Sequence, residues 1–201
     1  MFDEGYIKFN CDWKRSELPA DFNSEDLLAN RQFVFDKGLI GFDERENVGF
    51  GNISERYKEK QFIISGTQTG HIKILSNQDL SHITRFEIEK NSVTACGPAK
   101  PSSESLTHAS IYKSFRNINA VIHIHSQKFW NYYFDKLPTS APSIPYGTPE
   151  MALAVKTLIH PLVNEGIFIM GGHKDGVISF GHTFKDAKNL LFDFYNDLPE
   201  N

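Results

Sequence analysis

The chain has 201 residues, of which 40% are hydrophobic and 23% are charged, and its formal net charge at pH 7 is −4. This composition is typical of a globular protein that can bury a full core, and we expect residues 1–201 to form a single domain. The acidic balance excludes a general polyanion-binding surface, so we expect no nucleic-acid partner.

The first half of the chain predicts a strand, a helix and then three short strands. Residues 5–11 alternate well enough for a strand at the edge of a sheet. A helix begins near Asn23 or Ser24, whose side chains can cap free amides, and ends at Gly38. The three strands, each bounded by turn residues, cover residues 48–54, 61–65 and 83–88.

The second half alternates helices with strands. A helix is expected from Pro101 to about Phe115, followed by a strand over residues 120–125. The helix after Pro149 carries an apolar stripe that we assign to the core: Met151, Ala152, Val155, Leu158, Ile159 and Leu162. Two short strands and a closing amphipathic helix follow, over residues 167–170, 177–180 and 184–195. The interleaved elements predict one compact α/β unit.

Two histidines interrupt the apolar strand at residues 120–125. Because successive side chains of a strand point to opposite faces, His123 and His125 share one face with Val121. Two buried imidazoles side by side are costly, and a divalent metal offsets this cost by accepting a lone pair from each ring. The motif favours a metal site, with a hydrogen-bonded histidine pair or a strand with one wet face as the alternatives.

Six other histidines are candidates for a third ligand: His71, His82, His108, His160, His173 and His182. His173 is the first choice, because residues 171–176 form a glycine-rich turn directly after an apolar strand, where α/β folds present functional groups. His182 follows a similar turn and is the second choice. We expect His108 to be a structural hydrogen-bonding residue and His160 to lie at the surface of a helix end.

Three short polar segments carry the donors that bind a phosphate: Gly51-Asn-Ile-Ser54, Ser65-Gly-Thr67 and Pro101-Ser-Ser-Glu104. Glycine lets backbone amides approach an anion closely, and a helix N-terminus attracts one. Each segment alone also fits an ordinary turn or helix cap. Together they predict a cradle around one phosphate dianion.

The order of these motifs resembles the class II aldolase/adducin family, whose enzymatic members include fuculose-1-phosphate aldolase, and the resemblance spans roughly residues 27–191. It implies an α/β fold of three layers, with a mostly antiparallel central sheet flanked by helices, in a homo-oligomer that is usually a tetramer. It also implies individual roles: zinc binding by His123, His125 and His173, binding of the substrate phosphate by Asn52, Gly66, Thr67, Ser102 and Ser103, and acid/base catalysis by Glu104.

The resemblance and the chemistry of these groups together predict a metal-dependent lyase that uses zinc or another divalent transition metal. Three neutral imidazoles leave a bound dication free to act as a Lewis acid, and Glu104 would exchange a proton with the substrate. The expected reaction is reversible retro-aldol cleavage of a ketose 1-phosphate to dihydroxyacetone phosphate and an aldehyde, through a metal-stabilised enediolate. The alternatives are a sugar-phosphate dehydratase or 4-epimerase on the same site, and a non-catalytic binding protein like the adducin head.

The sequence departs from the family pattern in three places. The segment after His125 is shorter than in the aldolases, where it carries a tyrosine near the substrate. Three tyrosines lie nearby: Tyr132, Tyr133 and Tyr146. Family aldolases also continue into a tail with an acid tyrosine, whereas this sequence stops at Asn201, and Lys174 and Asp175 follow His173 where many members have glycine. These departures concern the proton donor to the departing aldehyde rather than the metal and phosphate sites.

The expected compartment is the cytoplasm, without a membrane partner. The first residues, MFDEGYIKF, carry acids where a secretory signal carries basic residues, and no apolar run reaches spanning length. Cys11 and Cys96 lie far apart, so we expect two reduced cysteines rather than a disulfide framework.

Overall fold

The computed structural model describes residues 7–160 and 165–199. The strands of the main sheet are β1 (Asn10–Arg15), β4 (Asn52–Lys58), β5 (Gln61–Ser65), β6 (Leu80–Glu87), β7 (Ser92–Gly97), β8 (Ala120–His125), β9 (Gly166–Ile169) and β10 (Gly176–Gly181). A separate hairpin consists of β2 (Gly41–Asp43) and β3 (Val48–Phe50). The helices are α1 (Glu25–Asp36), α2 (Ser105–Ser114), α3 (Gln127–Tyr133), α4 (Pro149–Ile159) and α5 (Phe184–Asn196).

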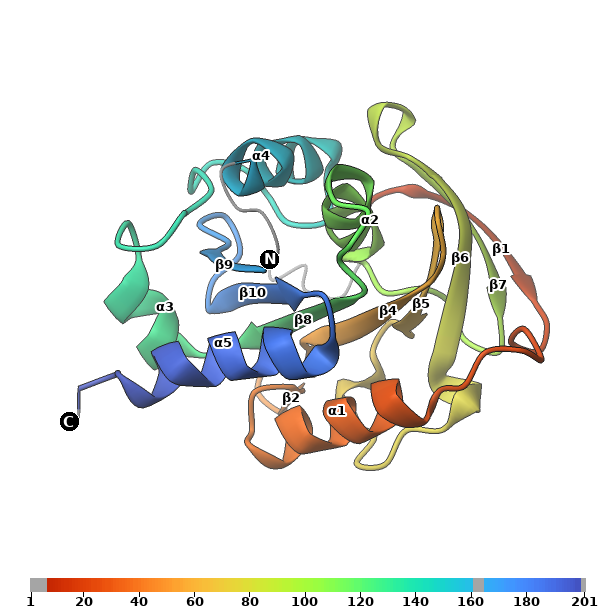
Figure 1. The fold of residues 1–201 in the computed structure, drawn as a ribbon, viewed down its shortest axis with the longest axis horizontal. Coiled ribbons are helices and arrows are strands. Elements are labelled where there is room, and N and C mark those ends of the chain that lie inside the picture. The colour runs from red at the N-terminus through yellow and green to blue at the C-terminus, as the bar shows by residue number, and fades with distance from the viewer. Residues whose placement is uncertain (1–6, 161–164, 200–201) are drawn as a thin grey trace.

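The main sheet lies between two layers of helices (Figure 1). Its strand order is β1-β7-β6-β5-β4-β8-β10-β9. Every neighbouring pair is antiparallel except β1 with β7, which is parallel. Helices α2 and α4 cover one face, and α1 and α5 cover the other. This is the three-layer, mostly antiparallel α/β fold predicted from the sequence.

The core is divided between the two faces of the sheet. Strand alternation puts Val121 into the cluster under α2 and α4, whereas Ile122 and Ile124 join the cluster under α1 and α5. The apolar stripe of α4 packs into the first cluster, as predicted, through Met151, Ala152, Val155, Leu158 and Ile159. The last residue assigned to that stripe, Leu162, lies outside the described residues.

The predicted helix signals of α1 act as expected. The side-chain oxygen of Asn23 accepts a hydrogen bond from the amide of Glu25 at 3.0 Å, which satisfies one of the free amides of the first turn. At the other end, Gly38 has a φ of +71° and its amide donates to the carbonyl of Phe35. Glycine adopts that left-handed backbone without a steric penalty and so ends the helix.

Several predicted strand boundaries are wrong. The strand expected over residues 48–54 is divided at Gly51, whose φ is +74° and where a β-carbon would lie 2.8 Å from Ile40 Cγ1. The edge strand expected over residues 5–11 begins only at Asn10 and continues to Arg15, and residues 5 and 6 lie outside the described residues. Ile88 begins a short 3₁₀ helix instead of ending β6. Sequence reasoning missed β2, β7 and α3.

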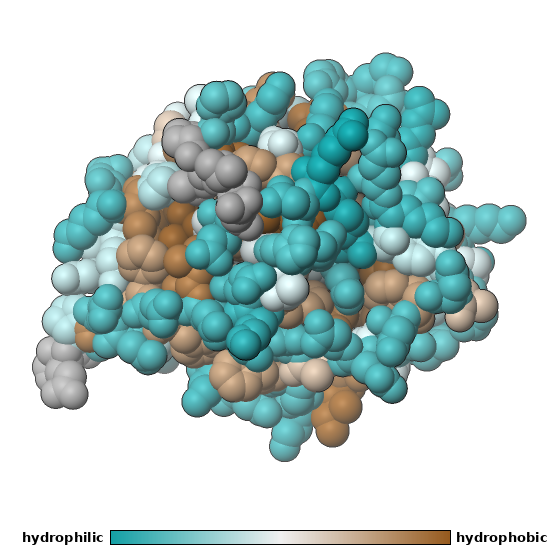
Figure 2. Space-filling view, viewed as in Figure 1, coloured by the Kyte–Doolittle hydropathy of each residue, from teal (hydrophilic) through white to brown (hydrophobic). Residues whose placement is uncertain are grey.

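The face of the molecule in Figure 2 is mostly hydrophilic, with hydrophobic residues visible between the hydrophilic ones. No helix in the described residues is long and apolar enough to cross a bilayer.

Candidate metal and substrate site

Three histidines meet at one end of the β8–β10 ladder. His123 and His125 come from β8, and His173 lies in the turn between β9 and β10. The first residue of β10, Gly176, pairs with His125. The ring centroids are 5.0 Å apart for His123 with His125, 5.0 Å for His123 with His173, and 4.6 Å for His125 with His173. One nitrogen from each ring lies within 4.8 Å of the others. This arrangement brings together the three predicted ligands.

Burial favours the neutral form of His123 in this cluster. His123 is 1% exposed and His173 is 3% exposed. Removal from water lowers the pKa of His123 well below its ordinary value, and the nearby imidazoles of His173 and His125 lower it further. The Nε2 atom of His123 has no hydrogen-bond partner among the described residues. Neutral imidazoles with a buried, unpartnered nitrogen fit a divalent cation, which binds this form of the ring.

Neighbouring side chains hold the three rings in place. The amide nitrogen of Asn52 lies 3.1 Å from Nδ1 of His123, because the two residues are paired across β4 and β8. Phe50 stacks on His125 with centroids 5.3 Å apart, and Tyr146 stacks on His173 at 4.3 Å. The chain thus fixes the ring positions with contacts from other elements.

Glu104 stands beside the cluster at the start of α2. It is 1% exposed, and its Oε1 lies 3.5 Å from Nδ1 of His173. The hydroxyl of Thr107 donates a hydrogen bond to its Oε2 at 2.6 Å. The structure therefore places the predicted acid/base residue next to one of the three histidines.

One small pocket lies against Glu104 and His123, and all five predicted phosphate-binding residues line it: Asn52, Gly66, Thr67, Ser102 and Ser103. The side chain of Ser102 already accepts a hydrogen bond from the Glu104 amide, as the capping alternative predicted. Sequence reasoning missed the further lining residues Gly49, Gln68, Thr69 and Gly70. The signal for three of them was visible, since residues 65–70 form an unbroken run of small and polar residues.

Gly70 is a lining glycine that close packing requires, because its neighbours leave no room for a side chain. A β-carbon at this position would lie 2.0 Å from the carbonyl oxygen of Gly41 and 2.7 Å from Cα of Gly49. The loop after β5 therefore presses backbone against backbone on the hairpin of β2 and β3. Close packing here forms one wall of the pocket.

A second pocket, of about 360 Å³, adjoins the cluster on the side of His125. Its wall includes Phe50 and Gln127, and also Lys174 and Asp175, the two residues that follow His173. The φ of Asp175 is +66°, and its carbonyl accepts a hydrogen bond from the Ser126 amide. Lys174 and Asp175 thus share this pocket with His125.

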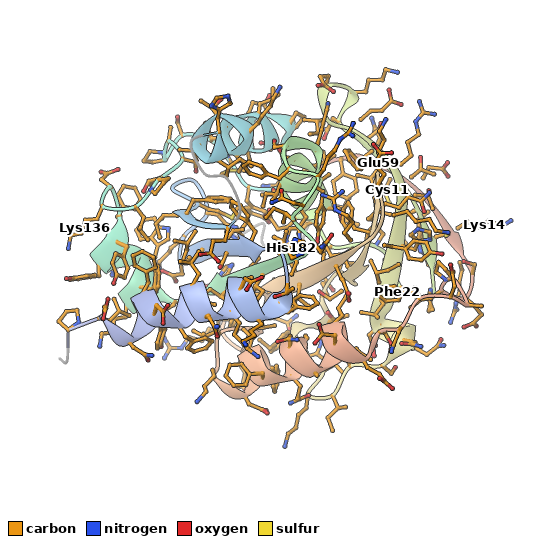
Figure 3. All side chains as sticks on the ribbon, viewed as in Figure 1. Cys11, Lys14, Phe22, Glu59, Lys136 and His182 are labelled. Carbon is orange, nitrogen blue, oxygen red and sulfur yellow. The ribbon has the colours of Figure 1, made fainter. Side chains whose placement is uncertain are left out.

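The remaining histidines are elsewhere or have structural partners. His182, labelled in Figure 3, follows β10 at the end remote from Gly176, roughly 16 Å along the strand, and its Nδ1 bonds to the Asn117 carbonyl. His108 is fully buried with Nδ1 2.7 Å from Ser54 Oγ, as predicted, and burial lowers its pKa to about 3. His71 and His160 are exposed, and His82 bonds to Gln61.

The three tyrosines considered as proton donors occupy different places. Tyr133 donates to the carbonyl of Phe194, and Tyr132 packs edge-on against Tyr133 beneath the amine of Lys136. Tyr146 reaches the site through the ring that stacks on His173. Tyr146 is therefore the tyrosine of this set that contacts the histidine cluster.

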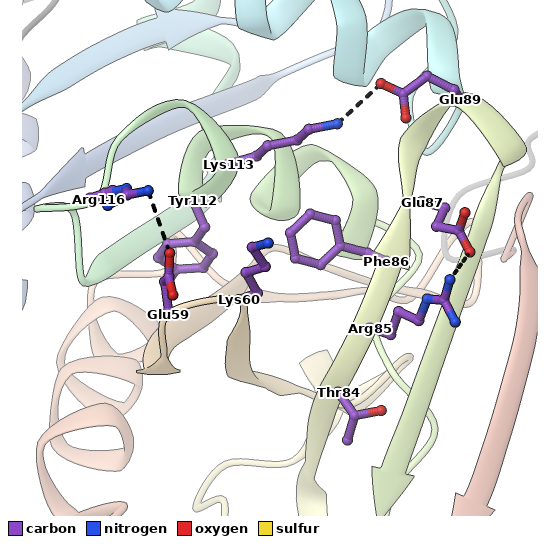
Figure 4. A pocket seen from close by; sticks show the side chains of 10 residues that line it. All are labelled: Glu59, Lys60, Thr84, Arg85, Phe86, Glu87, Glu89, Tyr112, Lys113 and Arg116. Atoms are coloured by element: carbon purple, nitrogen blue, oxygen red, sulfur yellow. Dashed lines mark hydrogen bonds and ion pairs between the residues drawn. The ribbon is translucent and has the colours of Figure 1, made fainter.

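A larger pocket, of about 420 Å³, lies at the other end of α2 (Figure 4). Three ion pairs surround it: Arg116 with Glu59, Lys113 with Glu89, and Arg85 with Glu87. Most of these side chains are well exposed, at 90% for Arg116. A depression formed by solvated ion pairs lacks the convergent buried groups of the histidine cluster, so size does not identify the site.

Comparison with known proteins agrees with the predicted family and fold. Residues 42–195 match the family model of the class II aldolase and adducin N-terminal domain, and the chain belongs to this family. It is 22% identical to 3-oxo-tetronate 4-phosphate decarboxylase of Haemophilus influenzae, with 80% of each chain covered.

Two solved structures show the same fold. The first is YgbL from Klebsiella pneumoniae, described provisionally as an aldolase/epimerase/decarboxylase: 20% identity, TM-score 0.65, and coverage of 86% of this chain and 84% of that one. The second is an L-fuculose 1-phosphate aldolase, with 18% identity, TM-score 0.61, and coverage of 90% and 86%. At these identities the likeness establishes the fold.

Proposed function

We propose that the chain is a divalent-metal-dependent lyase that cleaves a phosphorylated ketose by a retro-aldol reaction. The observation that carries this proposal is the buried cluster of His123, His125 and His173 with Glu104 beside it. A scaffold protein has no physical need for three clustered imidazoles, two of them buried, next to a buried carboxylate. Membership of the family that includes sugar-phosphate aldolases supports the same class of chemistry.

The three histidines would hold zinc or another divalent transition metal. Such a cation, when bound, supplies a Lewis acid that stabilises negative charge developing on the oxygens of the substrate. Asn52 would help His123 to bind it. An asparagine amide can present either its oxygen or its nitrogen to a ring, and the oxygen facing Nδ1–H leaves the Nε2 lone pair for a metal.

The pocket beside Glu104 would bind the substrate phosphate. Ser102 and Ser103 stand at the N-terminal end of α2, where free amides and the helix dipole favour an anion. Thr67 and Asn52 add polar side chains from two further segments. Binding of the phosphate would fix which carbon of the substrate faces Glu104, since the pocket and the carboxylate share a wall.

Glu104 would transfer the proton. Its carboxylate is buried, already oriented by Thr107, and directed at the position between the phosphate pocket and the histidines. In the direction of cleavage it would accept the proton that the substrate releases, and in the direction of synthesis it would return it.

A second candidate reaction is decarboxylation of a phosphorylated 3-oxo sugar acid. The similarity to 3-oxo-tetronate 4-phosphate decarboxylase favours it. The position of Tyr133 favours it as well, because its hydroxyl already bonds to the Phe194 carbonyl. Loss of carbon dioxide needs no proton on the departing group, whereas an aldehyde must exchange one.

Product analysis by NMR tests the proposal and separates the two reactions. The metal-loaded protein would be incubated with a panel of ketose 1-phosphates and of 3-oxo sugar-acid phosphates. Dihydroxyacetone phosphate from the first set supports the aldolase, and carbon dioxide from the second supports the decarboxylase. Glu104→Gln with full metal content is the matched control, and wild-type turnover by that variant would remove the mechanism.

Assembly is part of the same proposal. Family resemblance predicts a homotetramer with sites near subunit interfaces, and the pocket beside His125 is open on one side. We expect light scattering of the purified protein to give four times the chain mass of 22.9 kDa.

A further inference from the structure

The carboxylate of Glu104 does not serve as a helix cap, although its residue stands at the cap position of α2. Its backbone precedes Ser105, the first residue of the helix, and its side chain makes no hydrogen bond to the amides of the first turn. The side chain turns instead to Thr107, one turn along the same face of the helix.

This pairing reverses the usual order of residue types at a helix start. A capping box has a hydroxyl residue at the cap and an acid three positions later, and each side chain bonds to backbone. Here the acid, Glu104, is at the cap position and the hydroxyl residue, Thr107, comes three positions later. The two side chains bond to each other. A threonine inside a helix ordinarily bonds to a carbonyl of the preceding turn. The hydroxyl of Thr107 instead donates its hydrogen bond to the carboxylate of Glu104.

The two carboxylate oxygens of Glu104 face different neighbours. Oε2 accepts from Thr107 at 2.6 Å, a length typical of a hydroxyl that donates to a charged oxygen. Oε1 is thereby directed toward the histidines and lies 3.5 Å from Nδ1 of His173. Thr107 is fully buried and Glu104 is 1% exposed, so water does not replace the hydroxyl.

We propose that Thr107 is a positioning residue, which sets the orientation of the Glu104 carboxylate for proton transfer. This inference rests on the proposed role of Glu104. Thr107 touches the carboxylate and is absent from the lining of the phosphate pocket. Its loss should reduce the rate of the chemical step and leave substrate binding unchanged.

Two variants test the hydroxyl of Thr107. Thr107→Val keeps the shape and removes the donor, and Thr107→Ser keeps the donor. We expect Thr107→Val to lower kcat by roughly 10- to 100-fold with KM within about twofold, and Thr107→Ser to retain at least about half of wild-type kcat. Equal loss of kcat in both variants, or a change confined to KM, would overturn the proposal.

A double-mutant cycle separates positioning from a general structural role. If Thr107 acts through the carboxylate of Glu104, Thr107→Val should change kcat by less than about twofold in a Glu104→Gln background. The same 10- to 100-fold loss in that background would show that the threonine acts on the site by another route and would refute the inference.

A structural measurement, which does not depend on catalytic activity, tests the role of Thr107 separately from the proposed function. Crystal structures of the metal-loaded protein should show the Glu104 carboxylate displaced or in two orientations in Thr107→Val, and as in wild type in Thr107→Ser. If wild type cleaves no substrate of the panel while Glu104 still moves in Thr107→Val, the proposed function fails and positioning by Thr107 stands. A carboxylate that is unmoved in Thr107→Val contradicts the positioning role.

Discussion

The two pockets at opposite ends of α2 differ in the exposure of the titratable side chains that line them. At the C-terminal end, in Figure 4, ion pairs such as Arg116 with Glu59 lie in water and satisfy each other. At the N-terminal end, the pocket is smaller, and its wall includes Glu104 and His123, each 1% exposed. The smaller pocket contains the groups whose burial requires an explanation.

The comparison shows that a functional site is better identified by buried polar groups without hydrogen-bond partners than by the volume of its pocket. Exposed ion pairs contribute little to stability and tolerate replacement. A desolvated imidazole such as His123, whose Nε2 has no hydrogen-bond partner among the described residues, lowers stability unless a ligand binds it. Each prediction below compares a change at the buried site with a matched change elsewhere.

The largest effect should follow from removal of a ring of the cluster. In His123→Ala we expect loss of stoichiometric metal and a decrease in turnover of roughly 1,000-fold or more, because the Lewis acid is no longer held. Metal analysis by mass spectrometry and an activity assay measure both. His182→Gln, at the far end of β10, should retain metal and activity, and metal loss in both variants would contradict the assignment.

Replacement of the carboxylate should have the next largest effect. Glu104→Gln should bind metal as wild type does and lower kcat by roughly 100- to 10,000-fold, since it removes the group that transfers the proton. Glu59→Gln, in the pocket of Figure 4, is the matched control and should be active. Metal content is measured on the same samples, and a metal-free Glu104→Gln protein would indicate a ligand role instead.

Loss of one phosphate donor should have a moderate effect on binding. Ser103→Ala should raise KM by roughly tenfold with little change in kcat, because it removes one hydrogen bond to a charged oxygen. Steady-state kinetics with the phosphorylated substrate measure this change. Ser143→Ala, at an exposed position, should leave KM unaltered, and an unaltered KM in Ser103→Ala would place the phosphate elsewhere.

The buried histidine of α2 should make stability depend on pH. The pKa of His108 is lowered to about 3 in the folded chain, from an ordinary 6.5, by burial. The unfolded chain binds a proton between these values and the folded chain does not, so the free energy of unfolding falls as the pH falls from about 6.5 toward 3.

His108→Gln should flatten this dependence by a few kcal/mol over the range of about pH 6.5 to 3. Urea unfolding at several pH values measures the slope. His123 also has a lowered pKa, so part of the slope should persist. A slope equal to that of wild type would show that His108 does not stay neutral in the folded protein.

The smallest effect is expected in the large pocket. Lys60→Ala and Arg116→Ala should change turnover by less than about twofold, because both side chains are exposed and solvated. A rise in KM comparable to that expected for Ser103→Ala, or a fall in kcat comparable to that expected for Glu104→Gln, would contradict the distinction between the two pockets.

Local patterns predicted much of the fold. The period-2 alternation of residues 120–125 and the cap signals at Asn23 and Gly38 located β8 and α1 because they depend on neighbours in the chain. The division of residues 48–54 depends on a close approach of Gly51 to Ile40, which the pattern of these residues alone does not reveal. The strand β7 was missed although it pairs with β6, its neighbour in the chain, and its residues alternate between buried and half-buried positions, so a local signal was present.

The site was predictable where a motif carried its own chemistry. The pair His123 and His125 follows from strand alternation, and the glycine turn indicated His173. Contacts between elements were not predictable, such as the stacking of Phe50 on His125 and of Tyr146 on His173. Whether a tyrosine serves as proton donor depends on such contacts, which is why the motifs define the class of site and leave the reaction to experiment.

Anomalous diffraction from crystals grown with zinc tests the central claim most directly. Data collected on both sides of the zinc absorption edge should give one strong peak in contact with His123, His125 and His173. A peak elsewhere, or three imidazoles bonded only to water and protein at saturating zinc, would contradict the account.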